Sequence, residues 1–278
     1  TSARIILLFT LNVFSSPISP EGMSMATTIA GEELMYFTTA ANPPLNGLFS
    51  PEPKSPSITK WSGVRVGGTN WVLISHLRME GKYLFYPEEV QLTKHSHVIF
   101  HFTDGSTLVY EDVRKFGTME VLVPELVDSY FVNKKIGPEP TEAEFKWPAF
   151  QAALKKSKKP IKSALLDQKL VAGLGNIYVD EVLYRAKVHP ARLGQSLTAP
   201  EARAVRKETI AVLAQAVEKG GSTIRSYSNA FGEDGTMQEQ HQVYGKTGQP
   251  CSRCGSPIEK IQLGGRGTHF CPHCQKVK

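Results

Sequence analysis

All four cysteines of this 278-residue chain lie in its last 28 residues, as two Cys-x2-Cys pairs. The pairs are Cys251 with Cys254 and Cys271 with Cys274. Each pair can place two thiolates on one turn, and four thiolates satisfy the tetrahedral coordination of zinc. No ligand position then stays open for water or substrate, so the spacing predicts one structural Zn2+ ion rather than a catalytic metal. Two redox pairs or free structural thiols are the alternative interpretation.

A glycine-rich turn lies between the two cysteine pairs. Residues 258–263 and 267–270 are predicted to be the strands of a hairpin, with Gly264-Gly265-Arg266-Gly267 at its tip. Glycines let a backbone approach a phosphate closely, and the Arg266 guanidinium could bind one. Taken alone, a solvated arginine in a turn explains this segment more simply.

A second glycine-rich turn precedes Asn176, within the sequence KLVAGLGNIY. Asn176 is predicted to cap a helix, and the free N–H groups of a helix N-terminus bind anions. A packing corner between two helices explains the turn equally well. Just upstream is a basic run. A run of charges is usually only a solvated face, but this one adjoins two candidate phosphate binders and could be part of a nucleic-acid surface. Its members are Lys155, Lys156, Lys158, Lys159 and Lys162.

A third group combines an arginine with apolar side chains on two turns. Arg114 and Phe116 lie two residues apart, and Met79 lies in the turn LRMEG. Such side chains could wedge into a stack of DNA bases. Without further information the better interpretation is that Met79 and Phe116 are core residues and Arg114 is a surface charge. His76, His95, His97 and His101 have no ligand partner at fixed spacing, so sheet histidines are favoured over a metal site.

The elements that position these residues change character along the chain. Strands are predicted at 71–76, 82–86, 96–102 and 107–111, separated by turn signals as in an antiparallel sheet. After the linker at 137–140 the period becomes helical, with helices at 145–156, 162–171, 177–186 and 200–219. Residues 222–242 are predicted to be a polar loop with few apolar anchors.

Charge is divided unevenly between the two parts. Residues 141–278 hold 21 Lys and Arg against 12 Asp and Glu, a net of +9, whereas residues 1–140 have a net of −3. The positive part suits a polyanionic partner. Residues 1–70 hold only eight charged residues, and no strand or helix period persists there beyond the apolar run 5–14. That run is too short to span a bilayer, which takes about 20 residues, and metal-bound cysteines argue against its being a signal peptide.

From about Trp71 to the C-terminus the sequence resembles the formamidopyrimidine-DNA glycosylase family. The motifs SHLRMEGKY, DVRKFGT, KLVAGLGNIYVDEVL, GTMQEQHQVYG and GGRGTHFCPHC occur in that order. The resemblance implies an α+β multidomain fold: a β-sandwich with flanking helices, a helix-two-turn-helix domain and a zinc-finger β-hairpin. The domains expected are an unmatched segment 1–70, the remainder of the sandwich at 71–140, the helical domain with a lesion loop at 141–242, and the zinc finger at 243–278.

The resemblance also implies roles for individual residues. Met79, Arg114 and Phe116 match the residues that fill the gap left by a flipped nucleotide. Asn176 and Arg266 match phosphate-binding residues, and Arg266 also matches an arginine implicated in the elimination step. DNA contacts are expected from His95, Arg114, Lys158, Lys162, Asn176 and Arg266. Residues 222–240 match a loop that closes over the extruded base, because a stacked base hides its glycosidic bond.

The catalytic N-terminal segment of the family is not matched. Family members begin with a proline whose secondary amine attacks C1′, followed by an acidic glutamate. Here the sequence begins Thr1-Ser2-Ala3-Arg4 and contains no PELPE. The family's lysine in an RRGKY-like strand is also missing. We therefore expect the chain as written to bind damaged duplex but to show little Schiff-base chemistry. A shifted reading frame upstream of Trp71, a pseudogene product or a divergent paralogue would each explain the mismatch.

The resemblance implies a base-excision repair glycosylase with abasic-site lyase activity, acting on oxidised purines such as 8-oxoguanine and formamidopyrimidines. Its partner would be double-stranded DNA containing oxidised purines or abasic sites. The protein is expected to be a monomer without membrane association, in the cytoplasm or nucleoid. The rival hypothesis is a protein that binds damaged DNA without cleaving it. A zinc-ribbon transcription or ribosome-associated protein is a third, which leaves the helical motifs unexplained.

Overall fold

The structure is a computed structural model and describes residues 35–38, 62–66, 71–101, 106–224, 229–230 and 232–277. The chain divides into two compact units. Of the described residues, one unit comprises those up to Phe131 together with those between Thr223 and Gly235, and the other comprises Val132–Ser222 together with those from Thr236 onward. Among the described residues, no helix combines the length and the apolar character needed to cross a lipid bilayer.

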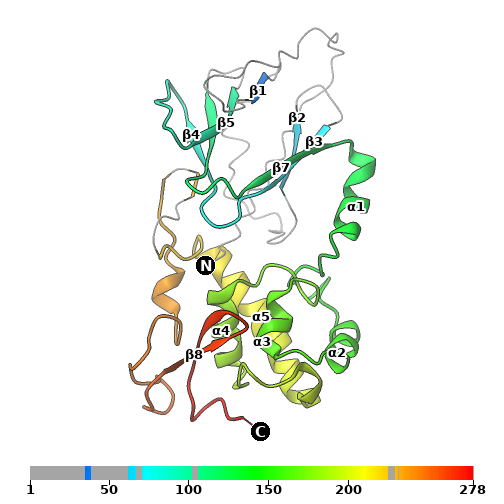
Figure 1. Cartoon of the computed structure of the whole chain (residues 1–278), viewed down its shortest axis with the longest axis vertical. Helices are drawn as coiled ribbons and strands as arrows, with labels where there is room; N and C mark the ends of the chain where they lie inside the picture. The colour runs from blue at the N-terminus through cyan, green and yellow to red at the C-terminus, as the bar shows by residue number, and fades with distance from the viewer. Residues whose placement is uncertain are drawn as a thin grey trace. The chain divides into compact units, whose positions relative to one another are not determined.

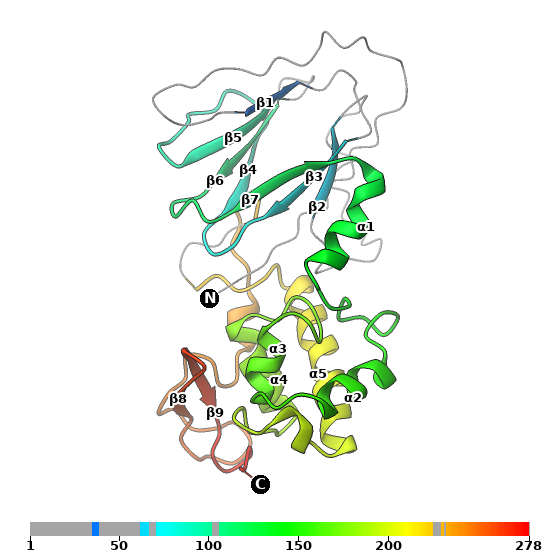
Figure 2. The same ribbon diagram turned by 45° about the vertical axis from the view of Figure 1, so that its right-hand side comes forward.

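The first unit contains two sheets, whose strands are labelled in Figures 1 and 2. One sheet has the strand order β1-β5-β6-β4, and the other has the order β2-β3-β7. Strand β1 pairs in parallel with β5, and all other pairs named here are antiparallel. The strands are β1 (Met35–Thr38), β2 (Ser62–Val66), β3 (Trp71–His76), β4 (Lys82–Tyr86), β5 (Ser96–His101), β6 (Thr107–Glu111) and β7 (Thr118–Leu122).

The core of this unit joins residues from both sheets. Leu73 from β3 packs in one buried cluster with Tyr83 from β4, Phe100 from β5 and Tyr110 from β6. Alternate side chains of a strand point to opposite faces, so each sheet contributes one apolar face to this cluster. The predicted β-sandwich is therefore confirmed.

Three of the predicted strands have the predicted bounds, and β5 is described to His101, with the last residue of its predicted range, 102, outside the described residues. Strands β1 and β2 lie in residues 1–70, where no persistent strand period was found in the sequence. Strand β7 and helix α1 (Pro124–Asn133) were also not predicted. Helix α1 carries a recognisable start signal, since Pro124 is its first residue and Glu125 lies in its first turn.

The second unit is built on four helices: α2 (Trp147–Lys155), α3 (Ile161–Leu166), α4 (Asn176–Arg185) and α5 (Ala199–Glu218). Helix α5 begins with a capping box between Thr198 and Glu201 and is followed by Gly220 and Gly221, both with positive φ. Helix α3 is shorter than predicted. It ends at Leu166, because Gln168 adopts a left-handed φ of 65° and its side chain bonds the turn that follows.

The C-terminal hairpin pairs β8 (Glu259–Leu263) with β9 (Arg266–Phe270). Strand β9 contacts α4, and Figure 1 shows the hairpin beside that helix. A small core beneath it contains Tyr184, Val243, Ile258 and two of the cysteines. The segment before the hairpin is less polar than expected, because Met237 in the short 3-10 helix Met237–Gln240 is fully buried.

Candidate nucleic-acid interface and metal centre

Three predicted wedge residues come together on the surface of the sandwich unit. The Arg114 guanidinium donates to Met79 Sδ at 3.3 Å, and its Cζ lies 4.5 Å from the centre of the Phe116 ring. Met79 is 38% exposed and Phe116 is 50% exposed, although both side chains are large and apolar. The core interpretation of Met79 and Phe116 is therefore wrong. Together they form an exposed apolar group with a cation in its centre, which we call the Met79–Arg114–Phe116 cluster.

The cluster stands on two tight turns. Arg78 and Lys115 have φ of 55° and 53°, in the left-handed region that non-glycine residues seldom adopt. His95 lies against the second turn, since its carbonyl accepts from Asp112 N at 3.1 Å. His95 itself is partly exposed. None of the histidines with described side chains belongs to a group that could hold a metal, and the side chain of His101 lies outside the described part.

In the helical unit, Asn176 and the start of β9 are joined directly. Asn176 is the first residue of α4 rather than its cap, a position that Gly175 takes. Its Nδ2 donates to Gly267 O at 3.0 Å, and its Oδ1 is buried without a hydrogen-bond partner. Arg266, the neighbour of Gly267, is exposed at the first position of β9 and not within the turn itself. The structure thus brings the two predicted phosphate binders to one place.

The two candidate lysines have opposite environments. Lys158 is exposed before α3 and is open to a phosphate. Lys162 is fully buried, and its ammonium donates to Asp180 Oδ1 at 2.7 Å, Thr268 Oγ1 at 2.8 Å and Gly267 O at 3.1 Å. An ammonium has three protons, so all of its donors are used. This placement corrects the expectation that Lys162 contacts DNA.

Asp180 completes this buried network between α3, α4 and β9. Its Oδ2 accepts from His269 N at 2.9 Å and lies 3.3 Å from His269 Nδ1. Burial lowers the pKa of Lys162, although the adjacent Asp180 carboxylate opposes that shift. The network bonds the backbone at Gly267 and at His269 and so helps to fix the position of the neighbouring Arg266.

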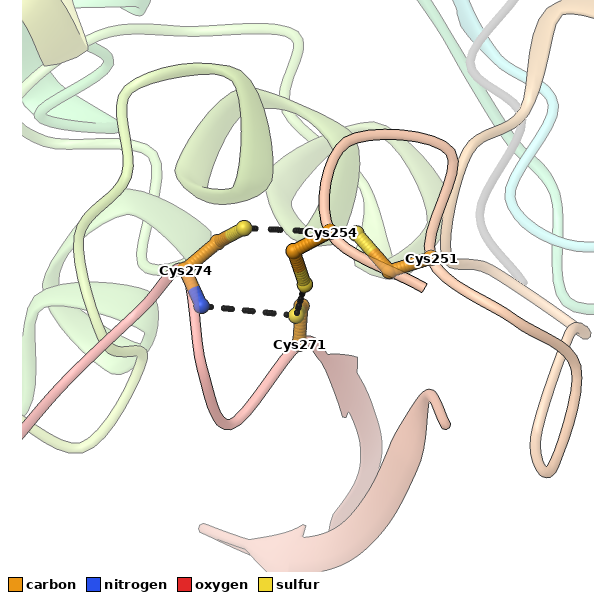
Figure 3. Close-up of side chains that lie close together, drawn as sticks. All are labelled: Cys251, Cys254, Cys271 and Cys274. Carbon is orange, nitrogen blue, oxygen red and sulfur yellow. Dashed lines mark hydrogen bonds between the residues drawn. The ribbon is translucent and has the colours of Figure 1, made fainter. Parts of the chain in front are cut away.

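The four cysteines converge as predicted (Figure 3). Their sulfur atoms all lie within 4.8 Å of one another, with Cys254 and Cys271 at 3.5 Å and Cys251 and Cys274 at 4.0 Å. Tetrahedral zinc with Zn–S bonds of about 2.3 Å needs sulfurs roughly 3.8 Å apart. None of the four forms a disulfide. The donor set therefore fits one structural zinc ion, and the alternative of redox pairs is not supported.

Helix α4 also supports the metal centre. Tyr184 Oη lies 3.3 Å from Cys251 Sγ and 3.1 Å from Ser252 Oγ. Arg253 stacks on the Tyr184 ring and donates to the carbonyl of the same residue at 2.7 Å.

Glu181, also buried on α4, accepts from three successive backbone N–H groups at Gln242, Val243 and Tyr244. These bonds fix the backbone of residues 242–244, which leads into the zinc finger.

Sequence reasoning did not identify Asp112, Asp180 or Glu181 as positioning groups. A signal existed for the α4 pair, because Asp180 and Glu181 interrupt a run of apolar residues on a helix that is buried. Buried carboxylates need partners, so such an interruption predicts an anchored network. For Asp112 the signal is its place two residues before Arg114 in DVRKFG, where an aspartate side chain can bond the following backbone.

Three family profiles match the sequence. The formamidopyrimidine-DNA glycosylase N-terminal domain matches residues 58–119, the H2TH domain of the same glycosylase matches residues 136–228, and the zinc finger found in FPG and IleRS matches residues 248–277. A formamidopyrimidine-DNA glycosylase of Streptococcus pneumoniae (strain ATCC BAA-255 / R6) is 74% identical over 208 residues, covering 75% of this chain and 76% of the relative. That of Streptococcus mutans is 63% identical over 204 residues, covering 73% and 75%.

Solved structures of similar proteins contain damaged DNA. A mutant FPG of Lactococcus lactis in complex with a Fapy-dG containing DNA aligns with a TM-score of 0.75 and 48% identity, covering 79% of this chain and 80% of that chain. A complex between the Lactococcus lactis Fpg and an abasic site containing DNA aligns with a TM-score of 0.71 and 50% identity, covering 76% of each.

Proposed function

The chain belongs to the formamidopyrimidine-DNA glycosylase family, and on that premise we propose that it is a base-excision repair glycosylase with abasic-site lyase activity. Its substrates would be oxidised purines in duplex DNA, such as 8-oxoguanine and ring-opened formamidopyrimidines. The similarity to glycosylases along three quarters of the chain favours this function over the rival of a protein that binds damage without cleaving it.

The Met79–Arg114–Phe116 cluster is the observation that carries the proposal. A base must leave the stack before its glycosidic bond can be reached, which costs a few kcal/mol. Exposed apolar side chains that enter the gap offset part of that cost. The cation–π contact holds Arg114 over Phe116, and in this proposal its guanidinium would enter the gap together with the two apolar side chains.

The phosphate-binding group would hold the backbone on either side of the extruded nucleotide. Arg266, Asn176 and Lys158 offer a guanidinium, an amide and an ammonium for this purpose. The helix α4 N-terminus adds free N–H groups beside Asn176. These contacts go to phosphates and carry no sequence information, as a repair enzyme that scans all sequences requires.

Catalysis divides between two parts of the chain. In the family the amine nucleophile and its acid lie in the N-terminal segment, which this sequence does not match. Within the described part, we propose that Arg266 also assists the elimination step, by the same resemblance. The zinc ion, when bound, supplies no chemistry of its own, because four thiolates fill its coordination. Its role is to hold the hairpin that carries Arg266.

The partner we propose is double-stranded DNA that contains oxidised purines or abasic sites. The protein would act as a monomer, on DNA in the cytoplasm and nucleoid of a bacterial cell. The net charge of +9 on residues 141–278 supports a polyanionic partner of this kind.

The activity is tested with a duplex that contains one 8-oxoguanine opposite cytosine, in the presence and absence of borohydride. The family activity predicts release of 8-oxoguanine and a trapped covalent adduct, with neither product from the same duplex containing guanine, whereas the unmatched segment that begins Thr1-Ser2-Ala3-Arg4 predicts binding with little of either product. Tight binding without release or adduct would replace the proposal with the binding-only rival. A second version with a family-like Pro-Glu segment in place of residues 1–70 then separates a missing nucleophile from a failure of recognition.

A further inference from the structure

One buried carboxylate organises the turn that carries Arg114 and Phe116. Asp112 follows β6 and is almost completely buried. Its Oδ1 accepts from Arg114 N at 3.0 Å. Its Oδ2 accepts from Phe116 N at 2.9 Å, Gly117 N at 2.8 Å and Tyr110 Oη at 3.0 Å. Two of these four donors are the backbone N–H groups of the two wedge residues on this turn.

The conformation of the turn needs such a partner. Lys115, between the two wedge residues, has a left-handed φ of 53°, which is unfavourable for a residue with a side chain. Its N–H donates to the Asp112 carbonyl at 3.3 Å, so Asp112 bonds this turn through both its side chain and its backbone. His97 Nε2 lies 2.8 Å from the same carbonyl. The conformation of the turn therefore depends mainly on hydrogen bonds to Asp112.

Tyr110 connects this turn to the one that carries Met79. Its hydroxyl bonds Asp112, and a Cβ added to Gly117 would overlap that hydroxyl. A Cβ added to Gly81 would lie 2.6 Å from it. Both turns thus pack against one phenol group with no room for a side chain. Burial raises the pKa of Tyr110, and the adjacent Asp112 carboxylate raises it further, so the hydroxyl stays a donor.

From this arrangement we propose that Asp112 is a positioning residue for lesion recognition, which acts by holding Arg114 and Phe116 against Met79 before DNA binds. The inference rests on the proposed function, because it explains how the wedge that this function requires is held in position. A wedge that is ordered in advance loses less conformational freedom on binding than one that must be ordered by DNA.

Burial of Asp112 raises its pKa, but the hydrogen bonds from Gly117, Arg114, Tyr110 and Phe116 outweigh this and hold the pKa below its usual value. The carboxylate therefore stays an acceptor at neutral pH.

The substitution Asp112→Asn tests the proposal. An asparagine offers one acceptor oxygen in place of two, so at least one of the backbone N–H groups would face an NH2 group. Asp128→Asn is the matched control, because it removes the same charge from an exposed position on α1 of the same unit. Binding is measured on a duplex with a tetrahydrofuran abasic analogue and on the corresponding single strand. A 2-aminopurine beside the analogue reports stacking in the gap.

We expect Asp112→Asn to weaken binding to the abasic duplex by about tenfold or more. The single strand should bind as before, and the 2-aminopurine signal should lose the change that the wild type produces. In a Phe116→Ala background the further loss from Asp112→Asn should be clearly smaller, since the part that acts through Phe116 is already gone. A loss that is equal on the single strand, or that persists in full in the Phe116→Ala background, would overturn the proposal.

Tyr110→Phe keeps the test decisive if Asp112→Asn does not fold. It removes one of the four donors and leaves the three backbone N–H bonds, so a smaller loss is expected, which is again reduced in the Phe116→Ala background. No loss from either variant would also overturn the inference. The proposed function fails separately: it fails if Phe116→Ala itself binds abasic and undamaged duplexes with the same ratio as the wild type.

Discussion

The ammonium of Lys162 on α3 lies 2.7 Å from Asp180 Oδ1 on α4, and at most 1% of either side chain is exposed. The other carboxylate oxygen of Asp180 accepts from the backbone of His269 on β9. Two helices and the strand that begins with Arg266 thus meet at one buried ion pair. The basic run of the sequence is not uniform: one of its members is an internal support for the phosphate site.

We therefore expect Lys162→Met to lower the free energy of unfolding of the helical unit by about 3 kcal/mol or more, because it leaves Asp180 buried without its partner. Lys158→Met removes the same charge from an exposed neighbour and should change stability by less than about 0.5 kcal/mol. Denaturant titration followed by far-UV circular dichroism measures both. Equal effects would contradict the burial of Lys162.

The metal centre predicts one zinc ion per chain. Because the thiolates come together only in the folded hairpin, the energy of zinc binding is part of its folding energy. Cys254→Ser should therefore lose zinc and lower the melting temperature, and a chelator should do the same to the wild type. Metal analysis that finds well under one zinc per chain, or a Cys254→Ser variant with unchanged zinc, would rule out this centre.

Arg266 should contribute to affinity in a way that depends on salt and not on the lesion. Removing one cation that binds a phosphate reduces the slope of log K against log salt by roughly one. Arg266→Ala should show that change on damaged and undamaged duplexes alike, whereas Arg203→Ala, which removes an exposed arginine stacked on Trp147, should not. A loss restricted to one lesion would mean that Arg266 contacts a base.

His241 should make the fold sensitive to mild acid. Burial, with a smaller effect from Lys246, lowers its pKa to about 4, from an ordinary value of 6.5. The unfolded chain therefore binds a proton that the folded chain does not between these values. The resulting stability is fully present above about pH 6.5 and is lost as the pH falls toward 4. His241→Gln should reduce this dependence, and superimposable profiles for variant and wild type would show that His241 does not cause it.

The sequence was sufficient for features that depend on local patterns. Short strand-like runs separated by turn signals predicted strands such as Thr107–Glu111, and the cysteine spacing predicted the metal centre. Lys162 could not be placed in this way, because its partner Asp180 is 18 residues away and meets it only through tertiary packing. The end of α3 was missed for a similar reason, since it depends on side-chain bonds from Gln168 across the following turn.

The wedge residues likewise combine a feature that local sequence predicts with one that only tertiary packing determines. The types and spacing of Arg114 and Phe116 suggested a wedge, but physical reasoning without the family resemblance favoured a core role. Exposure decided the question, and exposure depends on how two distant turns pack on Tyr110. The place of Asp112 two residues before Arg114 indicates a side-chain bond to the following backbone, but its burial against Tyr110 depends on tertiary packing.

The central claim, that the described part of the chain recognises damaged duplex DNA through its wedge, is tested most directly by one ratio. The dissociation constant is measured for an undamaged duplex and for the same duplex with a tetrahydrofuran abasic analogue, at one salt concentration. We predict at least about tenfold tighter binding to the damaged duplex. Phe116→Ala should bring the ratio close to one, whereas Leu92→Ala, at an equally exposed position of the same unit, should leave it unchanged. A wild-type ratio of one would contradict the account.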